Sequence, residues 1–248
     1  MKVEIINKDE VKDLFLHWGN FAKVCYDTKT NAPEKIGKHC LNSGHFSGSR
    51  SRYIELLITD VPRFVIDQCV RAEVGVVKNV QSFRYVGKNS FCYEIPSEIL
   101  DNEELLKKYH DHMMKTLELY EDIQSYVYNK VFDKTGSKEK AKERSNEQAR
   151  YVIPMSTHSS FVIGFTLEAL IHYCNIRLCT RTEDVHRKMA NMIKNEVLEQ
   201  LPELSDKLVP SCKYFMWCPE KKSCGAAPTK DKLTELLSKV VDVTKGQG

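Results

Sequence analysis

The chain has 248 residues, of which 37 are basic and 34 acidic, so its net charge at pH 7 is only +3. At about 150 residues per domain, this length fits one large domain, and we expect a single domain over residues 1–248. So small a charge disfavours nucleic-acid binding. The apolar runs are far shorter than the ~20 residues that cross a bilayer, so we expect a cytoplasmic protein without a membrane partner. Nine cysteines, an odd number, favour reduced thiols over a disulfide framework.

The first hundred residues predict short elements of both types. A Pro62 in the first turn suits a helix, which we expect to run to about Glu73. Residues 74–80 are β-branched and contain a glycine, and 43–52 are too polar for anything but a loop. The remaining expected elements are strands at 3–5, 53–59, 83–86 and 91–95, and helices at 11–25 and 34–41.

The rest of the chain predicts mainly helices. Apolar residues recur at three- and four-residue steps from Asp101 to Gly136, which is typical of a long helix ended by glycine. The charged stretch 137–149 predicts a solvated helix that ends before Pro154. Further helices are expected at 161–178, 183–201 and 230–241, with a loop-like tail after Pro210.

Several arginines lie in uncharged or aromatic surroundings. If residues 83–86 form a strand, Ser82 and Arg84 share one face and could together hold a phosphate. Arg150 could supply a second cation, because a guanidinium meets two oxygens at once. Structural ion pairs or plain surface positions are the alternative interpretation of each of these arginines.

Ordered motifs between about residues 21 and 225 resemble the flavin-dependent thymidylate synthases. They are Ser43–Ser47, Asp60–Arg71 followed by Gln81–Val86, Arg150–Pro154, Ala169–Arg181, and the cysteine-bearing tail Pro210–Gly225. The resemblance implies an α+β fold with a central mixed sheet flanked by helices. It also implies a homotetramer in which several chains build each site.

The resemblance further implies the chemistry. In that family, methylenetetrahydrofolate supplies a methylene group to C5 of dUMP, reduced FAD supplies hydride, and NADPH regenerates the flavin. By position, the residues that match nucleotide-holding ones are Gln68, Ser82, Arg84 and Arg150. Arg177 matches the arginine beside the uracil ring, where a fixed charge stabilises developing negative charge. Ser47, Arg71 and His172 match cofactor-facing positions.

The residues that match flavin-binding positions of the family depart from the family pattern. An arginine-histidine-arginine triplet is replaced by Arg71-Ala72-Glu73, and eight residues rather than seven precede Ser82. Charges are exchanged elsewhere: Arg50 replaces an acid, Glu168 replaces an arginine, and Arg181 replaces a histidine. We hypothesise a charge-swapped pocket. In it, Glu73 and Glu168 either pair with Arg50 and Arg181 or recognise a different cofactor.

Two functions therefore remain open. One is a thymidylate-synthase-type enzyme acting on dUMP or a related pyrimidine nucleotide. The other is a flavin-lacking paralogue that senses such a nucleotide, serves as a subunit of a heteromer with an active copy, or uses a different cofactor. Cys212, Cys218 and Cys224 lack a Cys-x-x-Cys knuckle, so no metal is expected there.

Overall fold

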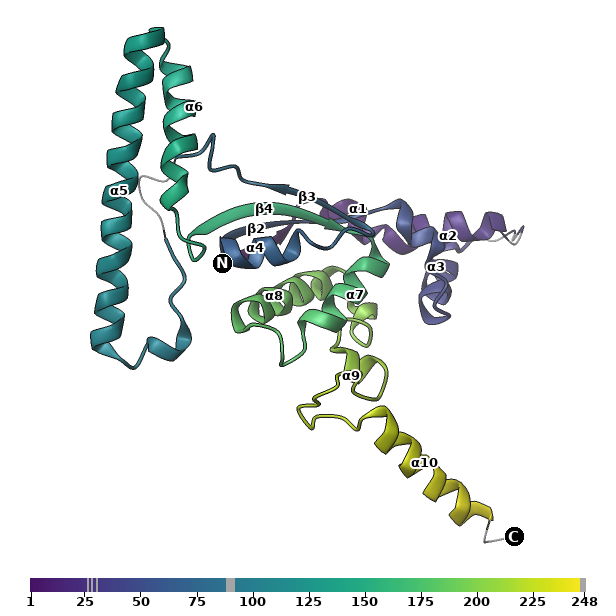
Figure 1. Ribbon diagram of the computed structural model, residues 1–248. Coiled ribbons are helices and arrows are strands. Elements are labelled where there is room, and N and C mark those ends of the chain that lie inside the picture. The colour runs from purple at the N-terminus through teal and green to yellow at the C-terminus, as the bar shows by residue number, and fades with distance from the viewer. Residues whose placement is uncertain (26, 28, 30, 88–91, 246–248) are drawn as a thin grey trace. The chain divides into compact units, whose positions relative to one another are not determined.

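The computed structural model describes residues 1–25, 27, 29, 31–87 and 92–245 (Figure 1). The fold is α+β, as the sequence predicts. Its sheet has the strand order β1-β2-β4-β3, built from β1 (Lys2–Ile5), β2 (Ile54–Pro62), β4 (His158–Phe165) and β3 (Val76–Val80). The four strands are antiparallel, whereas a mixed sheet was expected.

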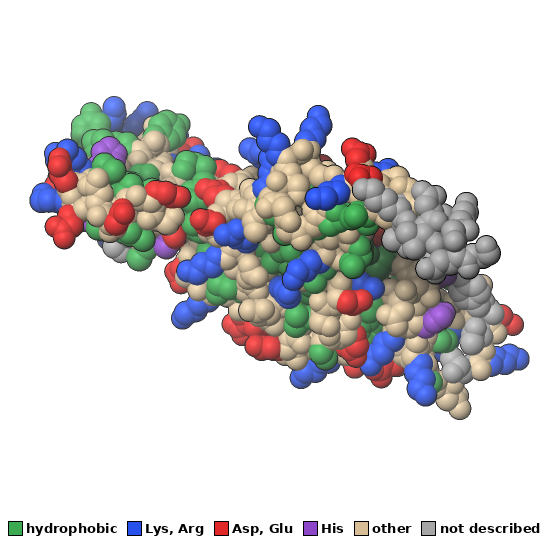
Figure 2. Space-filling view, turned by 90° about the horizontal axis from the view of Figure 1, so that it is seen from below, with side chains coloured by type: hydrophobic (Ala, Val, Ile, Leu, Met, Phe, Trp, Pro, Cys, Tyr) green, Lys and Arg blue, Asp and Glu red, His purple; other side chains and the backbone are tan. Residues whose placement is uncertain are grey.

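The chain forms two compact units. The first unit comprises residues 1–2, 58–72 and 78–162, and the second comprises 3–57, 73–77 and 163–248. Strands β2 and β4 each run from one unit into the other along the chain. On the face in Figure 2, basic, acidic and hydrophobic side chains are interspersed, in keeping with the nearly balanced charge. None of the helices in the described ranges is long and apolar enough to cross a membrane.

The first unit is dominated by a helical hairpin. Helix α5 (Glu103–Thr135) and helix α6 (Lys138–Ala149) lie side by side (Figure 1). Local signals set the ends of both helices. The Asn102 side chain accepts from the backbone N–H of Leu105, Gly136 ends α5 in a left-handed conformation at φ 64°, and Ser137 caps α6. The unit also contains α4 (Arg63–Cys69), η2 (Ser97–Ile99) and η3 (Arg150–Val152).

The second unit contains the other helices, several of which contribute buried apolar side chains to its core. They are α1 (Lys8–Lys12), α2 (Leu14–Cys25), α3 (Pro33–Asn42), η1 (Ser47–Ser51), α7 (Leu167–Arg177), α8 (Asp184–Gln200), η4 (Pro202–Leu204), α9 (Ser211–Tyr214) and α10 (Lys230–Lys245). Helices α2 and α3 approach so closely that a Cβ on Gly19 would lie 1.7 Å from the Pro33 carbonyl oxygen. Only glycine fits there.

Strand β2 contains a local irregularity in its first-unit part. Asp60 has a positive φ of 56°, in the left-handed region that few residues with a side chain adopt. Two residues later the chain turns into α4, whose first residue is Arg63. The backbone at Asp60 therefore helps to set the direction in which the start of α4 leaves the sheet.

Several predicted elements are wrong. The helix expected at 161–178 begins instead as strand β4, and α7 starts only after Thr166 caps it. The helix after Pro62 ends at Cys69 rather than near Glu73, and residues 83–85 form a turn rather than a strand. In the stretch 91–95, Phe91 lies outside the described residues, and Tyr93 forms a single bridge with Thr157. The loop expected at 43–52 contains η1.

Candidate functional site

A cavity of about 440 Å³ in the first unit is lined by cationic and hydroxyl side chains. We call it the arginine cavity. Arg63 reaches it from the start of α4, Ser82 from the segment after β3, and Arg150 from η3. Its other lining residues are Val80, Gln81, Phe83, Tyr151, Ile153, Pro154 and Met155. The structure therefore brings Ser82 and Arg150 together, as the sequence predicts.

Ser82 is held by a turn and not by a strand. The backbone N–H groups of Tyr85 and Val86 donate to the Ser82 carbonyl over 3.3 and 3.1 Å. The N–H of Arg84 also donates to the Ser82 hydroxyl oxygen over 3.2 Å. The alternation that would put Ser82 and Arg84 on one face does not exist in a turn, so Arg84 does not line the arginine cavity.

Arg84 instead meets the carboxylate of Glu143 on α6. Its Nη2 lies 2.6 Å from Glu143 Oε1, and its Nε is buried without a hydrogen-bond partner. Nearby, the pKa of Glu147 is lowered, first by its hydrogen bond with Arg144 and then by the charges of Arg84 and Arg150. This part of the first unit is thus rich in positive charge, with Arg84 already engaged by an acid.

Sequence reasoning missed Arg63 as a site residue. Its Nε lies 3.1 Å from Asp67 Oδ1, and its guanidinium stacks over the Phe83 ring at 5.6 Å. These two contacts orient the cation at the cavity wall. The available signal was its place directly after Pro62, at the start of a helix. Gln68, which the sequence assigns to the nucleotide, lies on the same helix but does not line the cavity.

A second cavity, of about 680 Å³, lies in the second unit, and five of its thirteen lining residues carry a ring. We call it the aromatic cavity. Its ring-bearing lining residues are Phe46, Tyr53, His172, Tyr214 and Phe215, and the remaining ones are Arg50, Val74, Gly75, Thr166, Glu168, Ala169, Ile171 and Asn175. Three residues predicted for the flavin side, Arg50, Glu168 and His172, thus meet here.

The exchanged charges Arg50 and Glu168 neutralise each other. Arg50 Nε donates to Glu168 Oε2 over 2.7 Å, and this hydrogen bond raises the pKa of Arg50. The side chains remain 63% and 45% exposed, so a ligand in the cavity can reach both. Of the two alternatives for the exchanged charges, pairing is thus observed for Glu168 and Arg50.

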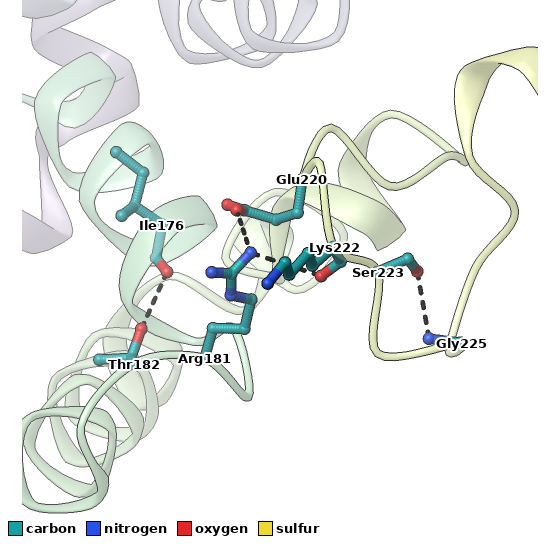
Figure 3. Close-up of polar contacts among 7 residues, drawn as sticks. All are labelled: Ile176, Arg181, Thr182, Glu220, Lys222, Ser223 and Gly225. Carbon is teal, nitrogen blue, oxygen red and sulfur yellow. Dashed lines mark hydrogen bonds and ion pairs between the residues drawn. The ribbon is translucent and has the colours of Figure 1, made fainter.

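Arg181 of the hypothesised charge-swapped pocket pairs with a different acid. Figure 3 shows Arg181 directed at the C-terminal tail, where its Nη1 lies 2.9 Å from Glu220 Oε2 and 3.4 Å from the Lys222 carbonyl oxygen. Glu73 is exposed and is not among the residues that line the aromatic cavity. The acid that Arg181 meets comes from the tail, and nothing in the sequence spacing reveals that.

The remaining flavin-side predictions are scattered. Ser47 lines a separate cavity of about 480 Å³ with Trp18 and His45. Arg71 and Ala72 lie just after α4, outside the lining of both main cavities. Within the second unit, Ser47 and His172 therefore line different cavities.

Arg177 is the last residue of α7 and is half-buried. Its charge reaches His186, whose pKa falls to about 4, mainly through burial and secondly through Arg177. The His186 Nε2 lies 3.0 Å from the Tyr173 hydroxyl. A neutral histidine is therefore built into the core close to the predicted base-facing arginine.

All nine cysteines are free thiols. Within the described ranges, no three His, Cys, Asp or Glu side chains are grouped closely enough to hold a metal ion. The functional groups that line the two cavities are thus arginines, hydroxyls, aromatic rings and one ion pair.

Comparisons with known proteins agree with these features. The flavin-dependent thymidylate synthase of Nitratidesulfovibrio vulgaris Hildenborough is 29% identical over 78% of this chain and 76% of the relative. The enzyme of the same name from Clostridium tetani is 28% identical over 86% and 89%.

The fold has matches among solved structures as well. A flavin-dependent thymidylate synthase ThyX from Helicobacter pylori, complexed with FAD and dUMP, superposes with a TM-score of 0.56 at 14% identity, covering 84% of this chain and all of that one. The family model described as thymidylate synthase complementing protein, Thy1, matches residues 13–203. Because this match spans more than half of the sequence, the chain belongs to the Thy1 family of thymidylate synthase complementing proteins.

Proposed function

We propose that the chain is a thymidylate-synthase-type enzyme that binds dUMP, or a related pyrimidine nucleotide, through the arginine cavity and alkylates C5 of the base. The observation that carries the proposal is the meeting of Arg63, Ser82 and Arg150 on one cavity wall. Relatives that match over most of the chain bear the name flavin-dependent thymidylate synthase. Family membership and cavity chemistry thus support the same substrate.

The arginine cavity suits a monophosphate. Two guanidinium groups offer paired N–H donors to phosphate oxygens, and the Ser82 hydroxyl adds a third donor group. Gln81 supplies an amide at the same wall. Gln68 and Arg84 stay assigned to the nucleotide, and the ion pair with Glu143 keeps the contribution of Arg84 small.

Arg177 is proposed as the catalytic cation at the pyrimidine. A fixed positive charge by the carbonyl edge of uracil stabilises the negative charge that develops as C5 reacts. The neighbouring His186 stays neutral near pH 7, because burial lowers its pKa. It therefore adds no second charge beside the base.

The aromatic cavity fits the ring systems of FAD. Flat rings stack well on Phe46, Tyr53 and Phe215, and Arg50 can face a diphosphate oxygen. Bound flavin would supply the hydride that completes the methyl group. Glu168 opposes this binding, because it neutralises Arg50 and repels phosphate. The cavity thus favours the rings and disfavours the diphosphate.

The remaining assignments follow from the same proposal. Methylenetetrahydrofolate and NADPH are proposed as co-substrates, and the cytoplasm as location, where nine free thiols stay reduced. A homotetramer is supported by exposed apolar side chains along α5, namely Leu105, Met114, Leu119 and Tyr126. The self-neutralised Arg50–Glu168 pair favours the second candidate function, a flavin-lacking nucleotide-binding subunit or sensor.

A visible absorption spectrum separates the candidates. The purified protein is incubated with FAD, freed of unbound ligand, and measured with and without dUMP. Retained flavin bands that shift with dUMP, followed by dTMP formation with methylenetetrahydrofolate and NADPH, would establish the enzyme. A colourless protein whose melting temperature rises with dUMP would support the flavin-lacking alternative. No response to dUMP in either measurement would refute both.

A further inference from the structure

A third cavity, of about 200 Å³ in the second unit, is lined by four of the nine cysteines. We call it the thiol cavity. Cys179 comes from the segment after α7, Cys212 from α9, and Cys218 and Cys224 from the tail. Arg181, Lys213 and Glu220 also line it, so cations outnumber acids at its wall. None of these residues belongs to the arginine cavity, and none of the four cysteines lines the aromatic cavity.

The four thiols differ in exposure. Cys224 is exposed, Cys179 and Cys212 are half-buried, and Cys218 is buried. An incoming molecule can therefore reach Cys224 directly, while the other three lie further inside the same cavity wall. This arrangement pairs one accessible thiol with sheltered ones that can react with it afterwards.

Local hydrogen bonds favour the thiolate of Cys224. Its neighbours form a tight turn, in which the Gly225 N–H donates to the Ser223 hydroxyl oxygen over 3.1 Å and Gly225 has a positive φ of 89° (Figure 3). Hydrogen bonds from the Thr180 side chain and from the Ala226 backbone N–H lower the pKa of the Cys224 thiol. Accessible thiolates of this kind are the reactive cysteines of proteins.

We infer that the thiol cavity is a thiol–disulfide exchange site, in which Cys224 is the attacking nucleophile and a low-molecular-weight disulfide is the oxidant. The Cys224 thiolate attacks one sulfur of the disulfide, whose S–S bond breaks and releases one thiolate. A second cavity thiol loses its proton, attacks the Cys224 sulfur and expels the other half. Two cysteines are then oxidised to one disulfide, and the reagent is reduced to two thiols.

The same segment of chain also lines the aromatic cavity. Tyr214 and Phe215 directly follow Cys212 and Lys213, and Asn175 borders both cavities. The Asn175 side chain donates to the carbonyls of Lys207 and Val209, and the Ser211 hydroxyl donates to the Asn175 carbonyl. A new covalent bond in the tail therefore alters the wall of the aromatic cavity. This consequence rests on the proposed function, whereas the exchange chemistry does not.

Reaction kinetics test the nucleophile. The reduced full chain is mixed at pH 7 with an aromatic disulfide that releases a coloured thiolate. We expect one thiol to react about tenfold faster than the other exposed cysteines. Cys224→Ser should abolish this phase, Thr180→Val should slow it several-fold, and the control Cys92→Ser, at an exposed cysteine of the first unit, should keep it. A fast phase that survives Cys224→Ser would overturn the assignment.

Mass spectrometry tests the second step. The chain is incubated with oxidised glutathione, digested without reduction, and mapped for disulfides. A bond from Cys224 to Cys179, Cys212 or Cys218 is the expected result. Only mixed glutathione disulfides, or a bond outside the cavity, would refute the exchange site. FAD retention is then compared between reduced and oxidised protein, and a change is expected. If the reduced protein retains no FAD, the flavin assignment fails while the thiol kinetics still decide the exchange site.

Discussion

The arginine cavity and the aromatic cavity differ in how their charges are satisfied. In the arginine cavity, Arg63 and Arg150 line the wall; Arg63 pairs with Asp67, and the charge of Arg150 acts on Glu147, which is hydrogen-bonded to Arg144. In the aromatic cavity, the arginine and the acid lie 2.7 Å apart and cancel each other. The arginine cavity can bind an anion directly, whereas an anion that binds Arg50 in the aromatic cavity must first break the Arg50–Glu168 ion pair. Of the exchanged charges, Arg50 and Glu168 thus meet in the aromatic cavity and neutralise each other.

The unit that holds the aromatic cavity should be the more acid-sensitive one. The pKa of His186 is about 4 in the folded state and ordinarily 6.5, so the unfolded chain binds a proton more readily. Stability is therefore complete above pH 6.5 and falls as the pH drops towards 4, by about 3 kcal/mol in total. Both tryptophans, Trp18 and Trp217, lie in this unit, so tryptophan fluorescence during urea unfolding reports on it.

His186→Gln should flatten that pH dependence, because glutamine does not titrate. His112→Gln, at an exposed position on α5, is the matched control and should leave the slope intact. Equal slopes for the wild type and His186→Gln between pH 7 and 5 would show that another group is responsible.

The arginine cavity should lose most of its affinity for dUMP when Arg150 is removed. Arg150→Ala deletes charge-assisted hydrogen bonds to the phosphate, which is expected to cost about 1.5–3 kcal/mol, or roughly 10- to 150-fold in Kd. Isothermal titration calorimetry with dUMP gives the value. Arg144→Ala, on the neighbouring helix α6, removes a cation that pairs with Glu147 instead and should change Kd little. Unchanged affinity in Arg150→Ala would remove the nucleotide from this cavity.

Glu168→Gln should raise the affinity of the aromatic cavity for anionic ligands. The change frees Arg50 and removes a repelling charge, while it keeps the shape of the side chain. We expect FAD to bind roughly fivefold more tightly, as fluorescence quenching of the flavin would show. Glu220→Gln breaks a different arginine–acid pair of this unit, Arg181–Glu220, and should leave FAD binding unchanged. Equal effects of both variants would mean that charge at Arg50 is not the obstacle.

Arg84 gives the smallest expected effect and the sharpest test of its ion pair. While Glu143 holds the guanidinium, Arg84→Ala should weaken dUMP binding only about twofold to threefold. Glu143→Gln should release Arg84 and tighten dUMP binding by a similar factor. A loss as large as that of Arg150→Ala would show that Arg84 leaves Glu143 when the nucleotide binds.

Local sequence signals predicted the elements whose ends they control. Gly136 predicted the end of the long helix, because a left-handed glycine acts within one turn of chain, whereas the caps at Asn102 and Ser137 were not predicted. The apolar run Phe161–Phe165 misled, since a short buried strand and a buried helix look alike without periodicity. The turn at Ser82 was also missed, because its hydrogen bonds compete with strand pairing in a way that composition does not reveal.

The site was predictable where the residue type alone decided its role. Ser82 and Arg150 meet in one cavity, and Arg50 pairs with Glu168, as expected. Partner choice over long distances in the sequence was not predictable. Arg84 pairs with Glu143, and Arg181 pairs with Glu220. The hairpin and the tail bring these carboxylates close to the arginines only when the chain folds.

The left-handed backbone at Asp60 has a consequence for mutational tolerance. A positive φ costs most residues about 1–2 kcal/mol, and glycine nothing. In a saturation scan of position 60, glycine and asparagine should therefore score as well as aspartate, whereas valine and isoleucine should score worst. The ranking would follow the backbone torsion of position 60 and not its side-chain charge, so the position would act as a conformational joint at the end of β2, before the helix that carries Arg63.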